Sequence, residues 1–367
     1  MTEFFFKTLN KKKSLIDEAL KKYLGQVTKE LPGFDNVFVK KQYELLVGYC
    51  LRNGKRLRPI MTLMAYQAVG GKNERKILLP ALAFELFHNY TLIHDDIYDE
   101  DEKRRDELSN HILLQQWFEQ KYGKRTVASK LYKNMATRFG VVAGIINGKC
   151  LHILSCLPIL EAKISNEKKL AGLKLHKEVS LVDNVGQAMD LSLEEERQIK
   201  EKEYYQMVLC KTGQLFKAAI EWGAILGSAT ASQRKALKSY AGELGQAFQI
   251  KDDLLDIGVA GKKGREVGSD IKKGKKTLLV IYALKKANAQ QKKNLLKALG
   301  NQKATSKQIK EIIKIFYELG SIRYCEKIAA QKIKKAIDCL DLARPSFLSG
   351  PKNFFQELAR FMFERSK

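Results

Sequence analysis

Proline is scarce in this chain of 367 residues: there are six, and none lies between Pro158 and Pro345. Nearly half the chain therefore lacks the residue that most strongly breaks helices. Strand-like alternation rich in Val, Ile and Thr is also rare, whereas apolar residues recur with i, i+3, i+4 spacing throughout. These absences predict an all-α fold, formed as a single domain over residues 1–367.

Cysteine pairs and long uninterrupted apolar runs are missing too. The six cysteines form no CxxC pair and no spacing matched to histidine, which is typical of reduced thiols in the cytoplasm. Glu3 and a lysine-rich stretch open the chain, unlike a signal peptide. The most apolar stretch, residues 139–160, is interrupted by Lys149 and His152, which favours a core helix. We expect a cytoplasmic protein with no more than peripheral membrane contact.

Acidic residues are outnumbered, with 41 Asp and Glu against 66 Lys and Arg, for a net charge of +25. Such an excess is typical of chains that meet nucleic acid, a lipid surface or phosphorylated small molecules. No nucleic-acid-binding signature accompanies the charge, so we expect no nucleic-acid partner. Most of the lysines lie on predicted solvent-facing helix surfaces, and the charge by itself indicates no function.

Two aspartate clusters carry the strongest chemical signal. They are "LIHDDIYDED", with Asp95, Asp96 and Asp99, and "FQIKDDLLDI", with Asp252, Asp253 and Asp256. Helical residues at i and i+4 share a face, so the outer carboxylates of each cluster lie together and repel unless a cation sits between them. Mg²⁺ suits such a site because it binds one or two carboxylates and completes its shell with water and phosphate. A single cluster could equally be a solvated helix end, but two clusters favour metal binding between facing helices.

Basic groups suited to phosphate flank these clusters. They are Lys55, Arg56 and Arg58 in "NGKRLRP", Arg104 and Arg105 after the first cluster, Lys211 and Thr212 in "CKTG", and Lys275 and Thr277 in "KKGKKT". Arginine forks suit bidentate contacts to phosphate, and lysine acts as a point charge. Each motif alone is weak in a lysine-rich chain. Together with two acidic clusters they predict a site for a diphosphate.

Two further segments carry local predictions. Ser192 and Glu195 have the spacing of a capping box, which predicts a helix from there through Lys211 to about Leu226. Residues 258–274 hold five glycines, which predicts a mobile loop that closes over the substrates.

The motifs, in their order along residues 43–284, resemble those of the trans-isoprenyl diphosphate synthases, or polyprenyl synthetase family. They are "GKRLRP", "ELFHNYTLIHDDIYDED", "RR", "GQAMDL", "KTGQLF", "GQAFQIKDDLLDI", "GSD" and "GKKT". The resemblance implies a helical bundle around a deep central pocket, a homodimer, and an Mg²⁺-dependent condensation of isopentenyl diphosphate with an allylic diphosphate.

The resemblance also implies a role for each matching residue. Asp95, Asp99 and Asp252 are expected to be direct Mg²⁺ ligands, and Asp96, Asp253 and Asp256 to support them. Arg104, Lys211 and Lys275 are expected to hold the allylic diphosphate. Gly54, Lys55, Arg58, His88 and Arg105 are expected to hold isopentenyl diphosphate. Thr212 and Gln249 are expected to lie beside the developing carbocation, whereas His94 is expected to pack in the core.

Product length and departures from the family pattern complete the prediction. Tyr90, five residues before Asp95, is expected to form the floor of the chain pocket, as in geranylgeranyl diphosphate synthases of archaeal type, although it could be an ordinary core aromatic. Asp106, Leu108 and Ser109 replace the family's Gly and Pro-Thr, and Lys149 replaces an Asp. The stretch between His111 and Phe139 is longer than in many members.

Several alternatives remain open from the sequence. The product could be farnesyl or a longer polyprenyl diphosphate. The chain could be a terpene cyclase, although cyclases usually carry a different second metal motif. It could also be a non-catalytic subunit of a heteromeric synthase, although such subunits tend to lose one aspartate cluster.

Overall fold

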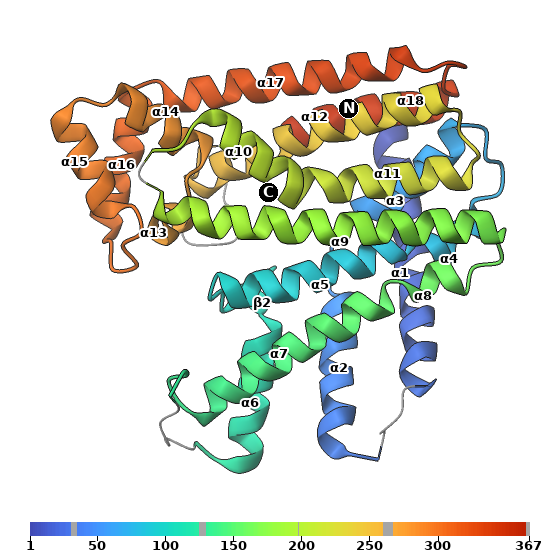
Figure 1. Ribbon diagram of the computed structural model, residues 1–367, viewed down its shortest axis with the longest axis horizontal. Coiled ribbons are helices and arrows are strands. Elements are labelled where there is room, and N and C mark those ends of the chain that lie inside the picture. The colour runs from blue at the N-terminus through green and yellow to red at the C-terminus, as the bar shows by residue number, and fades with distance from the viewer. Residues whose placement is uncertain (31–34, 125–129, 197, 260–266, 365–367) are drawn as a thin grey trace. The chain divides into compact units, whose positions relative to one another are not determined.

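The computed structural model describes residues 1–30, 35–124, 130–196, 198–259 and 267–364. Helices make up 79% of the structure. Within the described ranges the strands are β1 (Lys103–Arg104) and β2 (Glu107–Leu108), which pair antiparallel as one short hairpin. The all-α prediction is therefore confirmed (Figure 1).

The chain divides into two compact units. Unit 1 comprises Met1–Phe6, Met64–Lys72 and Lys174–Lys367, and unit 2 comprises Lys7–Leu63 and Asn73–Leu173. Three helices contribute residues to both units: α1 (Glu3–Glu30), α3 (Leu57–Ala68) and α9 (Asn166–Glu195). The single domain and its central pocket stay predictions, and each unit is described by itself below.

Unit 2 carries the first aspartate cluster at the end of α5. Its remaining elements are α2 (Val37–Leu51), η1 (Glu74–Ile77), α4 (Leu78–Ala81), α5 (Ala83–Tyr98), the β1–β2 hairpin, α6 (Asn110–Tyr122), α7 (Met135–Leu154) and α8 (Leu157–Leu160). Helix α7 packs against both α5 and α6. Glycines on α7 permit this close packing: a Cβ at Gly140 would lie 2.5 Å from the carbonyl oxygen of His111.

Helix α7 has one buried face and one exposed face. Ala143, Gly144 and Leu151 are buried, whereas Ile145 and Ile153 are 43% and 57% exposed. Residues Met135–Leu160 form the one described segment long and apolar enough to cross a membrane, by length and composition only. The prediction of a core helix therefore holds for one face of α7.

Unit 1 carries the second aspartate cluster at the end of α12. Its remaining elements are α10 (Glu201–Val208), η2 (Leu209–Gly213), α11 (Gln214–Leu226), α12 (Ala231–Asp256), α13 (Ser269–Lys273), α14 (Leu278–Lys286), α15 (Ala289–Ala298), α16 (Ser306–Glu318), α17 (Ser321–Cys339), η3 (Leu340–Leu342) and α18 (Ser349–Glu364). Helices α12 and α17 lie side by side over much of their length (Figure 1). Thr230 and Gln233 form the capping box that begins α12.

Two local predictions in unit 1 were wrong. Ser192 and Glu195 lie in the last turn of α9 rather than at a helix start, because the buried face of α9 continues through Asp190 to Leu193. Burial of a continuous helix face outweighs a local capping pair. The expected helix through Leu226 is instead α10, the π-helical turn η2 and α11.

The expected mobile loop at residues 258–274 is in part ordered. Ser269–Lys273 form α13, bounded by Gly268 and Gly274, which both have left-handed backbone angles (φ 81° and 82°). The backbone N–H of Gly268 donates to the carbonyl oxygen of Asp256 at 2.9 Å, which ties this segment to the end of α12. The rest of the loop prediction falls on residues 260–266, which lie outside the described residues.

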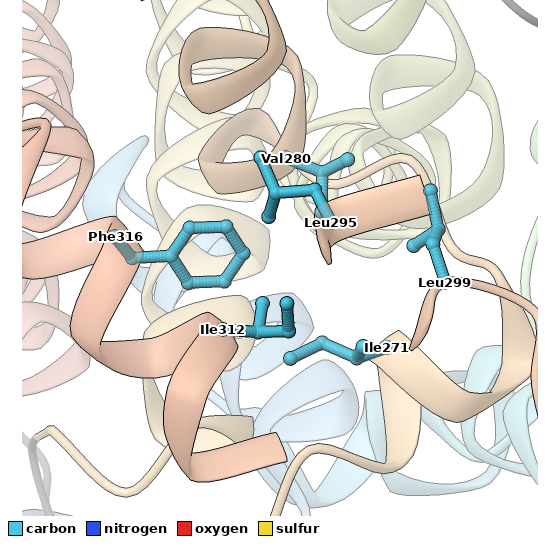
Figure 2. Close-up of a pocket in the computed structure, with 6 residues that line it drawn as sticks. All are labelled: Ile271, Val280, Leu295, Leu299, Ile312 and Phe316. Atoms are coloured by element: carbon cyan, nitrogen blue, oxygen red, sulfur yellow. The ribbon is translucent and has the colours of Figure 1, made fainter. Parts of the chain in front are cut away.

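A small apolar pocket lies where α13, α14, α15 and α16 meet. It is lined by Ile271, Val280, Leu295, Leu299, Ile312 and Phe316 (Figure 2). The six side chains point toward one another, and none is polar. These four helices therefore turn their apolar faces inward, which leaves their polar residues on the outer surface.

Candidate active site

The first aspartate cluster closes α5. Asp96 is fully buried, whereas Asp95 and Asp99 are partly exposed. The backbone N–H of Asp99 donates to the carbonyl oxygen of Asp95 at 2.8 Å, and Glu100 then turns the chain with φ 54°. The two outer carboxylates thus stand one turn apart at the end of an apolar helix, as the sequence predicts.

The middle aspartate of this cluster is held by two partners. Arg104 Nε donates to Asp96 Oδ1 at 2.6 Å, and the hydroxyl of Tyr49 donates to Asp96 Oδ2 at 3.0 Å. Burial raises the pKa of Asp96, while Arg104 and Tyr49 act in the opposite direction by stabilising the carboxylate. Asp96 therefore anchors Arg104 next to the two more exposed carboxylates. Sequence reasoning missed Tyr49, because nothing marks a lone tyrosine 47 residues away.

The hairpin that follows the cluster presents Arg105 at its tip. Arg105 and Asp106 both have positive φ, 57° and 64°, and lie between the paired residues Arg104 and Glu107. Two central residues with positive φ are the geometry of a type I′ turn, which strongly favours glycine or asparagine. Holding an arginine in this conformation costs free energy, and such strain is often found at functional sites.

Gly54 accommodates the guanidinium of Arg105. A Cβ at Gly54 would lie 2.8 Å from Arg105 Nη1, and Nη1 donates to the carbonyl oxygen of Asn53 at 3.3 Å. The structure thus brings together the "GKRLRP" segment and the "RR" segment, which lie about 50 residues apart in sequence. Any larger residue at position 54 would displace Arg105.

The arginines near Gly54 have different environments. Arg56 is buried and forms ion pairs with Asp17 at 2.7 Å and Glu85 at 2.8 Å, so its charge is already neutralised within the fold. Lys55 and Arg58, the two residues expected to hold substrate, lie on either side of it in sequence. Burial lowers the pKa of His88 well below its ordinary value, and Arg58 and Arg105 lower it further. His88 is therefore neutral, beside several fixed positive charges.

Tyr90 lies on α5 among other aromatic rings. Its ring centroid is 5.1 Å from those of Phe87 and His94 and 4.8 Å from that of His152 on α7. His94 also packs on Gly148, where a Cβ would lie 2.1 Å from His94 Nε2. These contacts fit the expected packing role of His94. Lys149, next to Gly148, lies on the exposed face of α7.

The second cluster also combines exposed and buried carboxylates, but only the first of its three aspartates is partly exposed. Asp252 is partly exposed, whereas Asp253 is buried. The hydroxyl of Tyr204 donates to Asp253 Oδ2 at 2.7 Å, and Gln249 Nε2 donates to Asp253 Oδ1 at 2.9 Å. Thr212 in turn donates to Gln249 Oε1 at 3.0 Å, so Thr212, Gln249 and Asp253 form one hydrogen-bonded chain.

The last aspartate of the second cluster helps to hold α13 against the end of α12. Asp256 is 2% exposed, and its Oδ2 accepts from the backbone N–H of Asp270 at 3.0 Å. The backbone N–H of Lys275 donates to the carbonyl oxygen of Asp270 at 2.9 Å. Asp256 thus positions α13 and, through it, Lys275.

Lys211 and Lys275 converge on Asp190. Their ammonium groups lie 2.7 Å and 2.8 Å from the same atom, Asp190 Oδ2, and Lys275 also contacts Glu194 at 2.5 Å. Burial by itself would raise the pKa of Asp190, but the two lysines outweigh it and hold the pKa below its ordinary value. Sequence reasoning did not assign Asp190 a role, although it lies in the "GQAMDL" motif and follows an apolar residue.

An irregular turn presents Lys211 and Thr212. Residues Leu209–Gly213 form the π-helical turn η2 between α10 and α11, and such turns are frequent at functional sites. Helix α9 approaches it closely, because a Cβ at Gly186 would lie 2.4 Å from the backbone nitrogen of Lys211. On the opposite side, a Cβ at Gly245 would lie 2.6 Å from the Cα of Gly213. Two glycines therefore fix the position of this turn.

The acidic residues do not form a metal site by themselves in the described part of the chain. Within the part of the chain that the structure describes, no three His, Cys, Asp or Glu side chains are grouped closely enough to hold a metal ion by themselves. The first cluster nevertheless offers two partly exposed carboxylates, and the second offers one, in each case beside a buried, hydrogen-bonded aspartate. Oxygen ligands of this kind fit Mg²⁺, which takes one or two protein carboxylates and retains water.

Comparison with known proteins settles the family. The model of the family described as polyprenyl synthetase matches residues 40–316. The chain belongs to the polyprenyl synthetase family. It is therefore a prenyltransferase, and the family resemblance predicted from its motifs is confirmed.

Similar proteins cover nearly the whole chain. It is 36% identical over 302 residues to a short chain isoprenyl diphosphate synthase of Methanocaldococcus jannaschii, covering 82% of this chain and 80% of the relative. It is 30% identical over 357 residues to a geranylgeranyl diphosphate synthase of Sulfolobus acidocaldarius, covering 96% and 100%. The crystal structure of geranylgeranyl pyrophosphate synthetase from Pyrococcus horikoshii Ot3 matches with a TM-score of 0.79 and 34% identity, covering 99% of this chain and 98% of that one.

Proposed function

We propose that this prenyltransferase condenses isopentenyl diphosphate with a dimethylallyl, geranyl or farnesyl diphosphate and releases geranylgeranyl diphosphate. The observation that carries the proposal is that both aspartate clusters are intact, each beside its own basic groups in its own unit. A non-catalytic subunit would not need both. The names of the relatives from S. acidocaldarius and P. horikoshii support a product of twenty carbons.

Mg²⁺ is the proposed cofactor, with Asp95, Asp99 and Asp252 as its direct ligands. These three carboxylates are the partly exposed ones, which supports their assignment. Asp96, Asp253 and Asp256 are buried and hydrogen-bonded, which supports a role in orienting their neighbours. When bound, the metal ions would neutralise charge on the diphosphate.

Arg104, Lys211 and Lys275 are proposed to bind the allylic diphosphate. Each is held by a carboxylate of its own unit, Asp96 for Arg104 and Asp190 for the two lysines. Groups held in this way need little reorganisation when negative charge develops on the departing diphosphate, so they stabilise the transition state. Thr212 and Gln249 are proposed to lie beside the allylic cation.

Isopentenyl diphosphate is proposed to bind near Gly54, Lys55, Arg58, His88 and Arg105. Neutral His88 can donate one hydrogen bond to a phosphate oxygen without adding charge, and Arg105 supplies a fork of donors. The allylic carbon–oxygen bond breaks, the double bond of isopentenyl diphosphate attacks the allylic carbon, and a proton passes to the released diphosphate. No nucleophile from the protein is needed.

Tyr90 is proposed to limit the product length. It lies more than one turn before Asp95 on α5, and its contacts with Phe87, His94 and His152 hold the ring in place. A ring fixed by three neighbours can act as a stop for a growing chain. A shorter farnesyl product or a longer polyprenyl product is the alternative.

Assembly and location are proposed from the surface of unit 2 and from the cysteines. The exposed apolar residues Ile145, Ile146 and Ile153 on α7 suit the interface of a homodimer. All six cysteines are free thiols, which supports a reducing compartment such as the cytoplasm.

The decisive experiment incubates the purified protein with Mg²⁺, isopentenyl diphosphate and each allylic diphosphate in turn, and sizes the products by mass spectrometry. We expect products that end at twenty carbons and disappear in Asp95→Asn. The matched control is Asp338→Asn, on an exposed face of α17, which should retain activity. Condensation with none of the primers would support the non-catalytic subunit, and a cyclic hydrocarbon product would support a terpene cyclase.

A further inference from the structure

One stretch of unit 1 is extreme in its charge. The 40 residues from Ile271 to Lys310 contain twelve lysines and no acidic residue, arginine or histidine. The first four lysines lie at or next to α13, near the candidate active site, and are partly buried. The other eight are all exposed, on the end of α14, on α15, on the start of α16 and, for Lys303, on the connection between α15 and α16.

Six of these lysines form what we call the α15 basic surface: Lys285, Lys286, Lys292, Lys293, Lys297 and Lys303. Within α15, Leu295 and Ala298 are buried, and Leu295 lines the apolar pocket (Figure 2). Lys293 and Lys297, spaced i, i+4, share the face of α15 that points away from the buried side, and the exposed Lys292 borders that face. None of the six forms an ion pair within the described ranges of the chain.

Helix α16 extends the same surface. Asn294 donates to Glu311 at 2.7 Å and Gln291 donates to Glu318 at 3.3 Å, so α15 and α16 run antiparallel. The end of α15, with Lys297, therefore lies at the same end of the pair as the start of α16, with Lys307. Glu318 lies at the other end of the pair, and Glu311 lies between the two ends, where it accepts from Asn294 rather than from a lysine of the surface.

One exposed apolar side chain, Leu296, lies among the lysines of the α15 basic surface. Leu296 is 50% exposed and lies one turn after Lys292 and Lys293, on the same side of α15. An exposed leucine among lysines is the pattern of a helix that lies in the headgroup region of a bilayer, with the apolar residue inserted and the lysine stems extended to the phosphates.

We propose that the α15 basic surface docks the protein on bilayers of anionic phospholipid. Each clustered lysine near an anionic membrane surface strengthens binding by roughly fivefold, so a patch of this size suffices for reversible docking. Nucleic acid fits less well, because the stretch has no arginine for bidentate recognition and presents flexible point charges instead. The proposal does not depend on the proposed function, since docking requires no substrate.

The test measures sedimentation of the full-length protein with vesicles of equal parts phosphatidylglycerol and phosphatidylcholine, at low and high salt and without substrate. We expect binding that salt reverses and that vesicles of phosphatidylcholine alone do not support. The variant Lys292→Gln/Lys293→Gln/Lys297→Gln should bind at least roughly tenfold more weakly. The control Lys11→Gln/Lys21→Gln/Lys22→Gln changes the net charge equally at exposed sites of α1 and should bind as the parent does.

Several outcomes would overturn the proposal. If both triple variants bound vesicles equally weakly, binding would depend on the net charge of the protein and not on the α15 basic surface. If the protein bound phosphatidylcholine vesicles as tightly as those with phosphatidylglycerol, binding would not depend on charge. Displacement of the protein from vesicles by a small amount of RNA, with tighter RNA binding that depends on the same three lysines, would assign the surface to nucleic acid. Because condensation activity is assayed separately, failure here leaves the proposed function standing.

Discussion

Lys211 and Lys275, 64 residues apart in sequence, donate to the same carboxylate oxygen, Oδ2 of Asp190. One buried carboxylate thus sets the separation of the two ammonium groups proposed to bind the allylic diphosphate. Two charges fixed by a third are pre-organised, which is the condition for effective electrostatic stabilisation of a transition state.

Asp190→Asn should therefore lower kcat by roughly tenfold or more without weakening diphosphate binding, because the lysines lose their anchor while the site becomes more positive. Steady-state kinetics with a varied allylic diphosphate separates kcat from KM. Glu194→Gln is the matched control. Glu194 contacts Lys275 but not Lys211, so this variant should lower kcat less than Asp190→Asn does. A rise in KM with unchanged kcat would contradict the anchoring role.

The same residue gives a pH dependence of stability. The pKa of Asp190 is held below its ordinary value of 3.8, so its ion pairs contribute fully above that pH and are lost as the pH falls through the lower folded-state pKa. The difference in free energy of unfolding between the parent and Asp190→Asn should stay constant from about pH 7 to pH 5 and shrink below about pH 4. Urea unfolding at several pH values measures it, and a difference that grows toward acid pH would refute the argument.

Close packing at Gly186 leads to a third prediction. An alanine there would place its Cβ 2.4 Å from the backbone of Lys211, which cannot move aside as a flexible side chain would. Gly186→Ala should cost about 1–3 kcal/mol of stability and raise the KM for the allylic diphosphate, because η2 is displaced. Gly48→Ala in α2 is the control: nothing lies within 4 Å of a Cβ there, so helix propensity should stabilise it by up to about 1 kcal/mol. Thermal unfolding of both variants tests the contrast.

These contacts mark what the sequence could and could not predict. The helices, both aspartate clusters and the basic motifs follow from spacing and residue type, and the family assignment agrees with them. Asp190 and Tyr204 could not be assigned, because a buried partner is selected by the fold and not by its sequence neighbours. The helix start predicted at Ser192 and Glu195 was wrong for the same reason, because burial along α9 decides where that helix ends.

The β1–β2 hairpin was also not predicted, and its turn shows why. Arg105 and Asp106 have left-handed backbone angles that neither residue favours strongly, so the local sequence gives a poor turn signal. The family pattern has glycine where this chain has Asp106. Asp106 has φ of 64°, a backbone angle that glycine adopts without steric cost, which explains the preference for glycine at this position.

Asp106→Gly should therefore raise stability by roughly 0.5–1 kcal/mol, because glycine adopts this backbone angle without strain. Asp106→Ala removes the same charge but keeps a Cβ, so it separates the backbone effect from the electrostatic one. Thermal unfolding should rank Gly above Ala at this position. Equal stability of the two variants would show that the turn is not strained.

Tyr90 allows the product-length hypothesis to be tested directly. Tyr90→Ala removes a ring that packs between Phe87 and His152, and the space it leaves should admit further isoprene units. We expect products longer than those of the parent, sized by mass spectrometry after incubation with farnesyl diphosphate. Tyr98→Ala is the control, since Tyr98 lies on the same helix but is 57% exposed, and its products should match those of the parent. An unchanged product distribution in Tyr90→Ala would show that Tyr90 is an ordinary core aromatic and does not limit the product length.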